Sequence, residues 1–179
     1  VYLAIGAHAG KSLGIEGDDK RGVMSAVEML HAAGDGTPMD FTGKNVIVVG
    51  GGNVAMDATR TSLRLGAKSV KCVYRRRKQD MTALFEEVEG AVAEGCELLT
   101  LRAPLRVEYD EQENVTGLWV QPQIIGELKH GRPAPRDSSK EPELIPCDYI
   151  IAAIGQAIDS AYFGQHGVPL QRDALTAEE

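Results

Sequence analysis

Cysteine is scarce in this chain, and its placement excludes two kinds of site. The 179 residues include three cysteines, Cys72, Cys96 and Cys147, which form no C-x-x-C pair and leave an odd number. Neither a disulfide framework nor a thiolate metal site is indicated, and the four histidines show no ligand spacing. We therefore expect no bound metal and a reducing, cytoplasmic setting.

Long apolar runs and an excess of positive charge are also missing. No stretch approaches the roughly 18 apolar residues that a membrane-spanning helix needs, and the N-terminus lacks a basic region followed by an apolar core. The formal net charge of −7 argues against a nucleic-acid-binding surface, which needs an excess of Lys and Arg on one face. We expect a soluble protein with neither nucleic acid nor membrane as a partner.

Strand and helix signals alternate in the middle of the chain. Short apolar runs at 44–49, 69–74 and 96–101 are typical of buried strands, whereas 53–65 and 84–92 carry apolar residues at helical spacing. This βαβαβ order predicts parallel strands, because each helix returns the chain to the same edge of the sheet. The predicted fold class is α/β, with a Rossmann-type parallel sheet and helices on both faces.

The pattern changes after the third strand. Apolar residues alternate at 105–109, a polar turn follows at 110–114, and the alternation resumes at 118–120. This predicts an antiparallel β-hairpin or meander. Residues 126–142, rich in Gly, Pro and charge, predict an exposed loop, and 144–154 is expected to form one further strand.

Two similar strand ends bracket this unit. Ala4-Ile5-Gly6 and Ala153-Ile154-Gly155 each close an apolar run, and the chain opens with the pattern of a strand already under way. We interpret the chain as a segment of a longer polypeptide, with two crossings into a neighbouring domain. On this interpretation residues 1–40 and 157–179 are connecting and return segments, and residues 41–156 form the nucleotide-binding domain.

A glycine-rich turn joins the first of these strands to the first helix. Gly50, Gly52 and Ala55 have the G-x-G-x-x-G/A spacing, in which the glycines permit a tight turn and close approach to a pyrophosphate, and Ala55 lets the helix pack closely. The helix N-terminus offers an anion its free N–H groups. A tight turn without a ligand is the alternative, but the complete strand–helix–strand context favours a dinucleotide.

Four basic residues, Arg75, Arg76, Arg77 and Lys78, follow the second strand. In NAD sites an Asp or Glu at this point binds the ribose hydroxyls, whereas an Arg accommodates the 2′-phosphate of NADP. Guanidinium groups bind a phosphate dianion through charge-assisted hydrogen bonds, and a carboxylate would repel it. The sequence predicts NADP(H), with Arg75 and Arg76 at the phosphate because they lie nearest the strand; a solvated basic loop is the alternative.

Three other patterns do not indicate catalysis. Residues 6–12 resemble a P-loop with the wrong glycine spacing, and residues 10–14 match G-x-S-x-G without a helix directly afterwards. Tyr74 and Lys78 have the Tyr-x-x-x-Lys spacing of some dehydrogenases, but we place them at a strand end and in a loop. We expect no catalytic acid, base or nucleophile in this chain.

Four segments together resemble a known family. Ala4–Gly6, Val49–Asp57, Val73–Arg76 and Ala153–Gln156 are similar to segments of the NADPH-binding domain of the glutamate synthase small subunit, and the likeness covers nearly the whole chain. Similar segments occur in dihydropyrimidine dehydrogenase and in other flavoproteins related to the pyridine nucleotide-disulfide oxidoreductases.

The resemblance implies a cofactor arrangement. In that family the NADPH domain is inserted into an FAD domain, so the loops at Gly6 and Gly155-Gln156 are expected near the flavin and the nicotinamide. The glycine motif of an FAD domain and the cysteine clusters of iron–sulfur centres are absent from this chain, and family members usually have Pro near Thr82 and often Thr near Ile5. The lack of C-x-x-C argues for electron transfer through a flavin to an acceptor other than a disulfide.

These observations predict the NADP(H)-binding domain of an FAD-dependent, NADPH-linked flavoprotein oxidoreductase, in which hydride passes between nicotinamide C4 and flavin N5. The expected partners are NADPH, the FAD domain of the same polypeptide, and an iron–sulfur or large catalytic subunit; the isolated chain is expected to be inactive. A non-catalytic NADP(H)-binding or redox-sensing module is the alternative. The residues expected to bind the cofactor are Gly50, Gly51, Gly52, Asn53, Val54, Ala55, Arg75, Arg76, Gly155 and Gln156.

Overall fold

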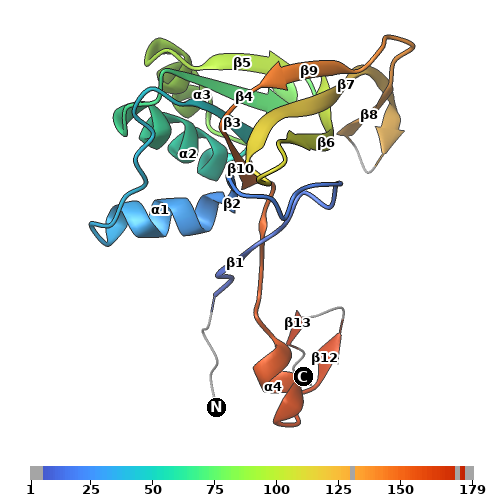
Figure 1. Ribbon diagram of the computed structural model, residues 1–179. Coiled ribbons are helices and arrows are strands. Elements are labelled where there is room, and N and C mark those ends of the chain that lie inside the picture. The colour runs from blue at the N-terminus through green and yellow to red at the C-terminus, as the bar shows by residue number, and fades with distance from the viewer. Residues whose placement is uncertain (1–5, 130–131, 172–173, 176–179) are drawn as a thin grey trace.

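A five-stranded parallel sheet forms the centre of the protein (Figure 1). The computed structural model describes residues 6–129, 132–171 and 174–175. All neighbouring strands of the sheet pair in parallel. In spatial order the strands are β2 (Val23–Ser25), β10 (Tyr149–Ala153), β3 (Asn45–Gly50), β4 (Ser69–Tyr74) and β5 (Glu97–Thr100). The apolar runs of the sequence predicted β3, β4 and β5.

Three helices cover one face of this sheet. Met29, Met56 and Val88, one from each helix, belong to a single core cluster with Val48 of β3 and Ile151 of β10. No helix in the described ranges has the length and hydrophobicity that a bilayer crossing needs. The three helices are α1 (Ala26–Gly34), α2 (Asn53–Arg64) and α3 (Phe85–Ala93).

An antiparallel sheet covers the other face. Ile47 and Val49 of β3 and Val73 of β4 point to this side and share a second core cluster with Leu118 and Val120 of the antiparallel sheet. The strand order is β6-β7-β8, with β9 also paired to β7. These strands are β6 (Arg102–Tyr109), β7 (Val115–Lys129), β8 (Arg132–Asp137) and β9 (Glu143–Pro146). The predicted antiparallel hairpin after the third strand is confirmed as β6 and β7.

The expectation of helices on both faces of the parallel sheet was wrong. Strands β2, β3, β4 and β5 succeed one another in one direction across the sheet, and right-handed crossovers that all move in one direction place their helices on the same face. The chain then returns from β5 to β10, in the opposite direction, so the connection lies on the opposite face. The antiparallel sheet is this connection and replaces the expected helices.

Two predictions about the second half of the chain were also wrong. Residues 126–142, expected as an exposed loop, contain the end of β7 and all of β8. Because β8 lies at the edge of its sheet, it tolerates proline, since one side of an edge strand needs no backbone donor. The run 144–154 is two strands: β9 ends at Pro146 in the antiparallel sheet, and β10 starts at Tyr149 in the parallel sheet.

A short two-stranded ribbon extends from the carboxyl edge of the parallel sheet. Its strands β1 (Ala9–Gly10) and β11 (Gln156–Ala157) pair antiparallel, and the Lys11 N–H donates to the Gly155 carbonyl at 3.1 Å. The two expected crossings therefore lie side by side, although Ala4 and Ile5 are outside the described residues. Beyond the ribbon lie α4 (Ala161–Gln165), β12 (Leu170–Gln171) and β13 (Ala174–Leu175) (Figure 1).

The parallel sheet and its helix layer include residues that precede residue 41. Both β2 and α1 fall within the expected connecting segment 1–40, yet they belong to the parallel sheet and to its core. A three-residue strand gives too little periodicity to be recognised. The assignment of the remaining flanking residues to a neighbouring domain stays a prediction.

Candidate nucleotide-binding site

A pocket of about 540 Å³ opens at the carboxyl edge of the parallel sheet. Its walls come from the ends of β3, β4 and β10 and from the starts of α1 and α2. The chain leaves β3 on the helix face but reaches the neighbouring β10 from the antiparallel sheet on the opposite face. Connections that diverge in this way leave a crevice outside the strand ends, which is where open α/β sheets bind their ligands.

Nine of the ten residues predicted to bind the cofactor line this pocket. Ala55, the tenth, is fully buried in the core between α2 and the sheet, which is the packing role that the motif assigns to it. The three strand ends thus bring together residues that are more than 100 positions apart in the sequence, such as Gly50 and Gln156, although contact of each one with a nucleotide stays a prediction. The nine are Gly50, Gly51, Gly52, Asn53, Val54, Arg75, Arg76, Gly155 and Gln156.

Two of the three consecutive glycines are required by the fold itself. A Cβ on Gly50 would lie 2.4 Å from the carbonyl oxygen of Ala153 in the neighbouring strand. A Cβ on Gly51 would lie 2.4 Å from the ring of Tyr74. Both distances are far inside van der Waals contact, so these glycines allow two strand ends to approach each other closely, with or without a ligand.

The third glycine, Gly52, is not required by the fold. Its backbone is extended, with φ −104° and ψ 178°, a conformation open to any residue. A Cβ built there meets a single side-chain atom, the Thr82 hydroxyl oxygen, at 3.4 Å. The protein therefore leaves space in front of Gly52, at the point where the motif predicts that a pyrophosphate approaches the backbone.

The N-terminus of α2 faces this space without a side-chain cap. Gly52 is the N-cap residue, and the first turn of the helix contains no acidic side chain. The Gly52 carbonyl accepts from the N–H groups of Ala55 and Met56. Within the described part of the chain, the N–H groups of Asn53 and Val54 donate to no protein acceptor. Free donors at the positive end of a helix dipole form an anion site.

Residues 80–83, which we call the rim, close one side of the pocket. The N–H groups of Thr82 and Ala83 donate to the Gly51 carbonyl at 2.9 and 3.1 Å. Tyr74, whose ring packs against Gly51, donates its hydroxyl to the Asp80 carbonyl at 2.8 Å. The segment after β4 is thereby fixed against the glycine turn, and Thr82 lines the pocket.

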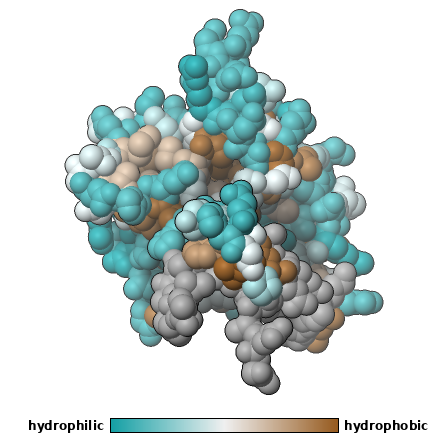
Figure 2. All heavy atoms as spheres, turned by 90° about the horizontal axis from the view of Figure 1, so that it is seen from below, coloured by the Kyte–Doolittle hydropathy of each residue, from teal (hydrophilic) through white to brown (hydrophobic). Residues whose placement is uncertain are grey.

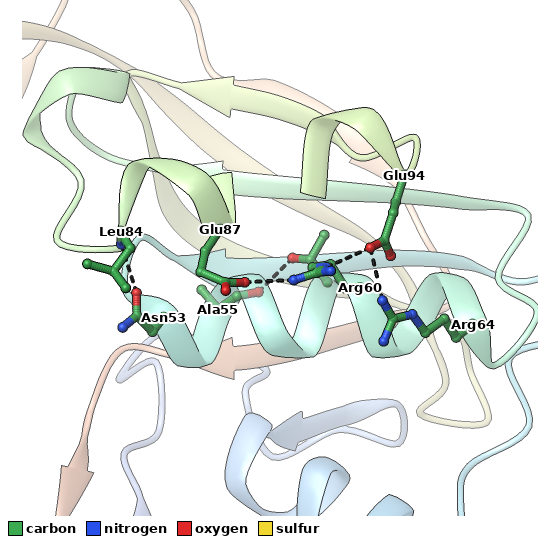
Figure 3. Close-up of polar contacts among 8 residues, drawn as sticks. Asn53, Ala55, Arg60, Arg64, Leu84, Glu87 and Glu94 are labelled. Atoms are coloured by element: carbon green, nitrogen blue, oxygen red, sulfur yellow. Dashed lines mark hydrogen bonds and ion pairs between the residues drawn. The ribbon is translucent and has the colours of Figure 1, made fainter. Parts of the chain in front are cut away.

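Helix α3 is clamped along α2 beyond this rim (Figure 3). The N–H of Leu84, the N-cap residue of α3, donates to the Asn53 side-chain oxygen at 2.9 Å. This bond fixes the side-chain amide of Asn53 at the mouth of the uncapped helix. The Arg60 hydrogen bond lowers the pKa of the Glu94 carboxyl, so these groups stay charged at neutral pH. Ion pairs further along the helices are Arg60–Glu87, Arg60–Glu94 and Arg64–Glu94.

Two of the four basic residues after β4 are neutralised by acidic neighbours. Arg77 forms two hydrogen bonds to the Asp80 carboxylate, at 2.8 and 2.9 Å. This contact lowers the pKa of Asp80 and makes it the partner of Arg77 in the short 3₁₀ turn Lys78–Asp80. Lys78 pairs with Glu89 of α3. Neither side chain lines the pocket.

The other two, Arg75 and Arg76, line the pocket. The charge of Arg76 also contributes to lowering the pKa of the Asp80 carboxyl, whose main partner is Arg77. Arg76 is held by the antiparallel sheet, since its Nε donates to the Pro133 carbonyl at 3.1 Å and its own carbonyl accepts from Leu101 at 3.0 Å. Arg75 is exposed. The structure thus separates the basic run into two residues that pair locally outside the pocket, Arg77 and Lys78, and two that line it, Arg75 and Arg76.

Several pocket residues were not predicted, and most of them are apolar. Leu13, Val27, Pro104 and Ile154 come from four separate segments, so no local spacing links them to the glycine motif. Thr82 gave no signal either. Hydrophobic residues are visible among hydrophilic ones on the side where the β1–β11 ribbon lies (Figure 2). Among the described residues that line the pocket there is no Asp, Glu, His or Cys.

All three cysteines are buried and unpaired. Burial raises the pKa of Cys72 to about 12, of Cys96 to about 11 and of Cys147 to about 12. The groups therefore stay as thiols at neutral pH, and a thiolate nucleophile is not available at any of the three positions.

The sheet order, the glycine turn and the pocket at the carboxyl edge place the protein in the class of Rossmann-type α/β domains. The family model of the pyridine nucleotide-disulphide oxidoreductases matches residues 1–179. The chain belongs to this family, as the four similar segments of the sequence predicted.

Similar proteins agree with this assignment. The chain is 40% identical over 166 residues to the NADPH-Fe(3+) oxidoreductase subunit beta of Geobacter sulfurreducens, covering 90% of this chain and 25% of the relative. It is 33% identical over 182 residues to the glutamate synthase [NADPH] small chain of Escherichia coli strain K12, covering 95% of this chain and 39% of the relative. The chain thus spans about a quarter to two fifths of these relatives' length.

A solved structure shows the same fold. Mycobacterium tuberculosis FprA in complex with NADPH superposes with a TM-score of 0.76 and 19% sequence identity, over 98% of this chain and 53% of that chain. Thioredoxin reductase from Lactococcus lactis superposes with a TM-score of 0.71. At this level of identity the likeness supports the α/β architecture with its added antiparallel sheet.

Proposed function

We propose that this chain is the NADP(H)-binding domain of an FAD-dependent oxidoreductase, and that it holds the nicotinamide for hydride transfer to or from the flavin, which passes electrons to another acceptor. The observation that carries the proposal is the uncapped N-terminus of α2 beside two arginines that line the same pocket. These features match the two negative groups of NADP(H), its pyrophosphate and its 2′-phosphate.

The residues of this chain bind and orient the nucleotide. The N–H groups at the start of α2 and the open space at Gly52 receive the pyrophosphate, and Arg75 and Arg76 at the end of β4 receive the 2′-phosphate. The apolar residues Val27 and Ile154 exclude water from the remaining pocket. Since β4 ends beside β3, the distance between the two phosphate sites follows from the parallel sheet.

The pocket fits a reaction in which no side chain transfers a proton. Nicotinamide and flavin, when bound, supply the redox chemistry through direct hydride transfer. The described residues that line the pocket are mainly glycines, apolar residues and the two arginines, which suit binding and positioning. The contribution of the chain is then proximity and orientation.

The remaining parts of the enzyme lie outside the chain in this proposal. The paired strands β1 and β11 leave the pocket side by side, as two crossings to an FAD domain would, and Gly155 and Gln156 lie where they meet the pocket. One relative is named as the beta subunit of an oxidoreductase, which supports a further subunit as a partner; in our proposal it is an iron–sulfur or large catalytic subunit. The buried, unpaired cysteines are suited to a reducing cytoplasm.

Calorimetric titration of the purified chain with NADPH and NADH tests the proposal. We expect NADPH to bind more tightly than NADH, and we expect neither flavin absorbance nor steady NADPH oxidation with an artificial acceptor. Absence of NADPH binding would overturn the proposed site. Bound flavin or steady turnover would show that the flavin chemistry resides in this chain, and flanking gene sequence without an FAD motif would favour a redox-sensing module.

A further inference from the structure

The hydroxyl of Thr82 faces the open space in front of Gly52. Thr82 lines the pocket, and its Oγ1 is the atom nearest to the position that a Cβ on Gly52 would take, at 3.4 Å. The side chain comes from the rim, whose main chain is bonded to Gly51, and therefore lies beside the N-terminus of α2. A group bound at the uncapped helix would be within reach of both this hydroxyl and the first N–H groups of the helix.

This hydroxyl is a weakly used hydrogen-bond donor. Its contact with the Gly51 carbonyl is 3.4 Å long, at the limit for an O–H···O bond. That carbonyl already accepts from the main-chain N–H groups of Thr82 and Ala83 at 2.9 and 3.1 Å, which uses both of its lone pairs. The hydroxyl can thus rotate toward a ligand at little cost, while the two main-chain bonds keep Thr82 in place.

We propose that Thr82 donates a hydrogen bond from Oγ1 to a pyrophosphate oxygen of the bound dinucleotide; this inference rests on the proposed function. NADPH and NADH carry the same pyrophosphate, so Thr82 contributes to the affinity for both and to the preference for neither. Arg75 and Arg76 face the 2′-phosphate, which NADH lacks. The two sets of residues therefore have separable effects on binding.

The test compares Thr82→Val and Thr82→Ser with the wild-type chain, by calorimetric titration with NADPH and NADH. Valine keeps the shape of threonine without its donor, and serine keeps the donor. A hydrogen bond to a charged acceptor corresponds to about 10- to 100-fold in affinity, and solvent exposure of Thr82 favours the lower value. We expect Thr82→Val to weaken both dinucleotides about tenfold and Thr82→Ser to stay within about twofold of the wild type.

A third ligand distinguishes the loss of a direct hydrogen bond in Thr82→Val from a displacement of the rim. 2′-AMP carries the adenosine 2′-phosphate but no pyrophosphate, so Thr82→Val should leave its affinity unchanged. An equal loss for 2′-AMP, an equal loss in Thr82→Ser, or no loss in Thr82→Val would each overturn the inference while wild-type binding still supports the proposed function. Wild-type protein that binds neither dinucleotide would overturn both.

Discussion

Helices α1 and α2 begin at the same edge of the sheet and against the same pocket, but they differ in N-terminal capping. In α1 the Ser25 hydroxyl accepts from the Val27 N–H at 3.1 Å, and the Glu28 carboxylate accepts from the Ser25 N–H at 3.3 Å. In this capping box, side chains of the helix itself accept hydrogen bonds from backbone N–H groups at its N-terminus. In α2 the N-cap is Gly52, which has no side chain to offer.

The difference shows which helix end is left for a ligand. Every helix begins with N–H groups that have no partner within the helix, and a helix whose donors are already used has little left for an anion. The N-terminus of α1 is also covered by chain, since a Cβ on Gly10 would lie 1.9 Å from the Ser25 hydroxyl. The N-terminus of α2 has open space in front of it. The same backbone geometry thus gives a structural cap at one site and a candidate phosphate site at the other.

The largest effect should follow from giving α2 the kind of cap that α1 has. In Gly52→Asp the new carboxylate would accept from the free N–H groups of α2 and repel the pyrophosphate. Losing two hydrogen bonds of about 1.5–3 kcal/mol each to a charged group predicts NADPH binding weaker by about 1000-fold or more. Stability should change by only a few tenths of a kcal/mol, because Gly and Asp differ little as N-caps. Calorimetry and thermal unfolding measure the two quantities.

Gly52→Val is the uncharged control for this variant. Its branched side chain occupies the same space, so it should also abolish binding while the fold remains, because the nearest described atom to the new Cβ is the Thr82 hydroxyl oxygen, at 3.4 Å. Unchanged NADPH affinity in both variants would place the nucleotide elsewhere.

A smaller effect is expected at the end of β4. Replacing Arg75 and Arg76 by Ala should weaken NADPH by about 30- to 1000-fold, because each residue loses a charge-assisted hydrogen bond of about 1.5–3 kcal/mol, reduced by solvent screening. NADH should be affected much less, since it lacks the 2′-phosphate. Binding titrations with both nucleotides check the prediction. Added salt should reduce the ratio of NADPH affinity to NADH affinity in the wild type, because it screens the charges of the arginines and the 2′-phosphate.

Arg77→Ala is the matched control, because Arg77 is committed to Asp80 and does not line the pocket. It should change the affinity for both nucleotides by less than about threefold, the size expected of a screened surface charge. Equal losses of NADPH and NADH in the double variant would instead show that Arg75 and Arg76 hold the loop in place and do not contact the phosphate.

The sequence predicted those parts of the fold whose signals are local. The glycine turn, the strands around it and the helix stops at Gly66 and Gly95 follow from periodicity and backbone freedom, and both glycines have positive φ, +90° and +107°. The capping box of α1 was present as Ser25-Ala26-Val27-Glu28. It was missed because the three-residue strand before it gave no pattern that would mark a strand–helix unit.

The parts of the fold that the sequence did not predict depend on contacts between segments that are far apart in the chain. The run 144–154 is apolar almost throughout, and the change from one sheet to the other takes place where the Asp148 carboxylate accepts from the Asn45 N–H at 2.7 Å. Such a contact over 103 positions leaves no local spacing to recognise. The placement of all three helices on one face has the same origin, because it follows from the spatial order in which β2, β3, β4 and β5 succeed one another in one direction across the sheet.

The smallest expected effect on nucleotide binding concerns α1, the helix whose N-terminus is capped by its own side chains. Ser25→Ala removes the hydroxyl that accepts from the Val27 N–H, and loss of an N-cap costs about 1 kcal/mol of stability. NADPH affinity should stay within about twofold of the wild type, since the proposed pyrophosphate site is at α2, whereas the N-terminus of α1 is closed by its own capping box. Urea unfolding and calorimetry check both values, and Glu28→Gln, which keeps a capping-box acceptor, is the control. Weaker NADPH binding with unchanged stability would mean that the N-terminus of α1 also contacts the nucleotide, and the division between a capped helix and a ligand-binding helix would be wrong.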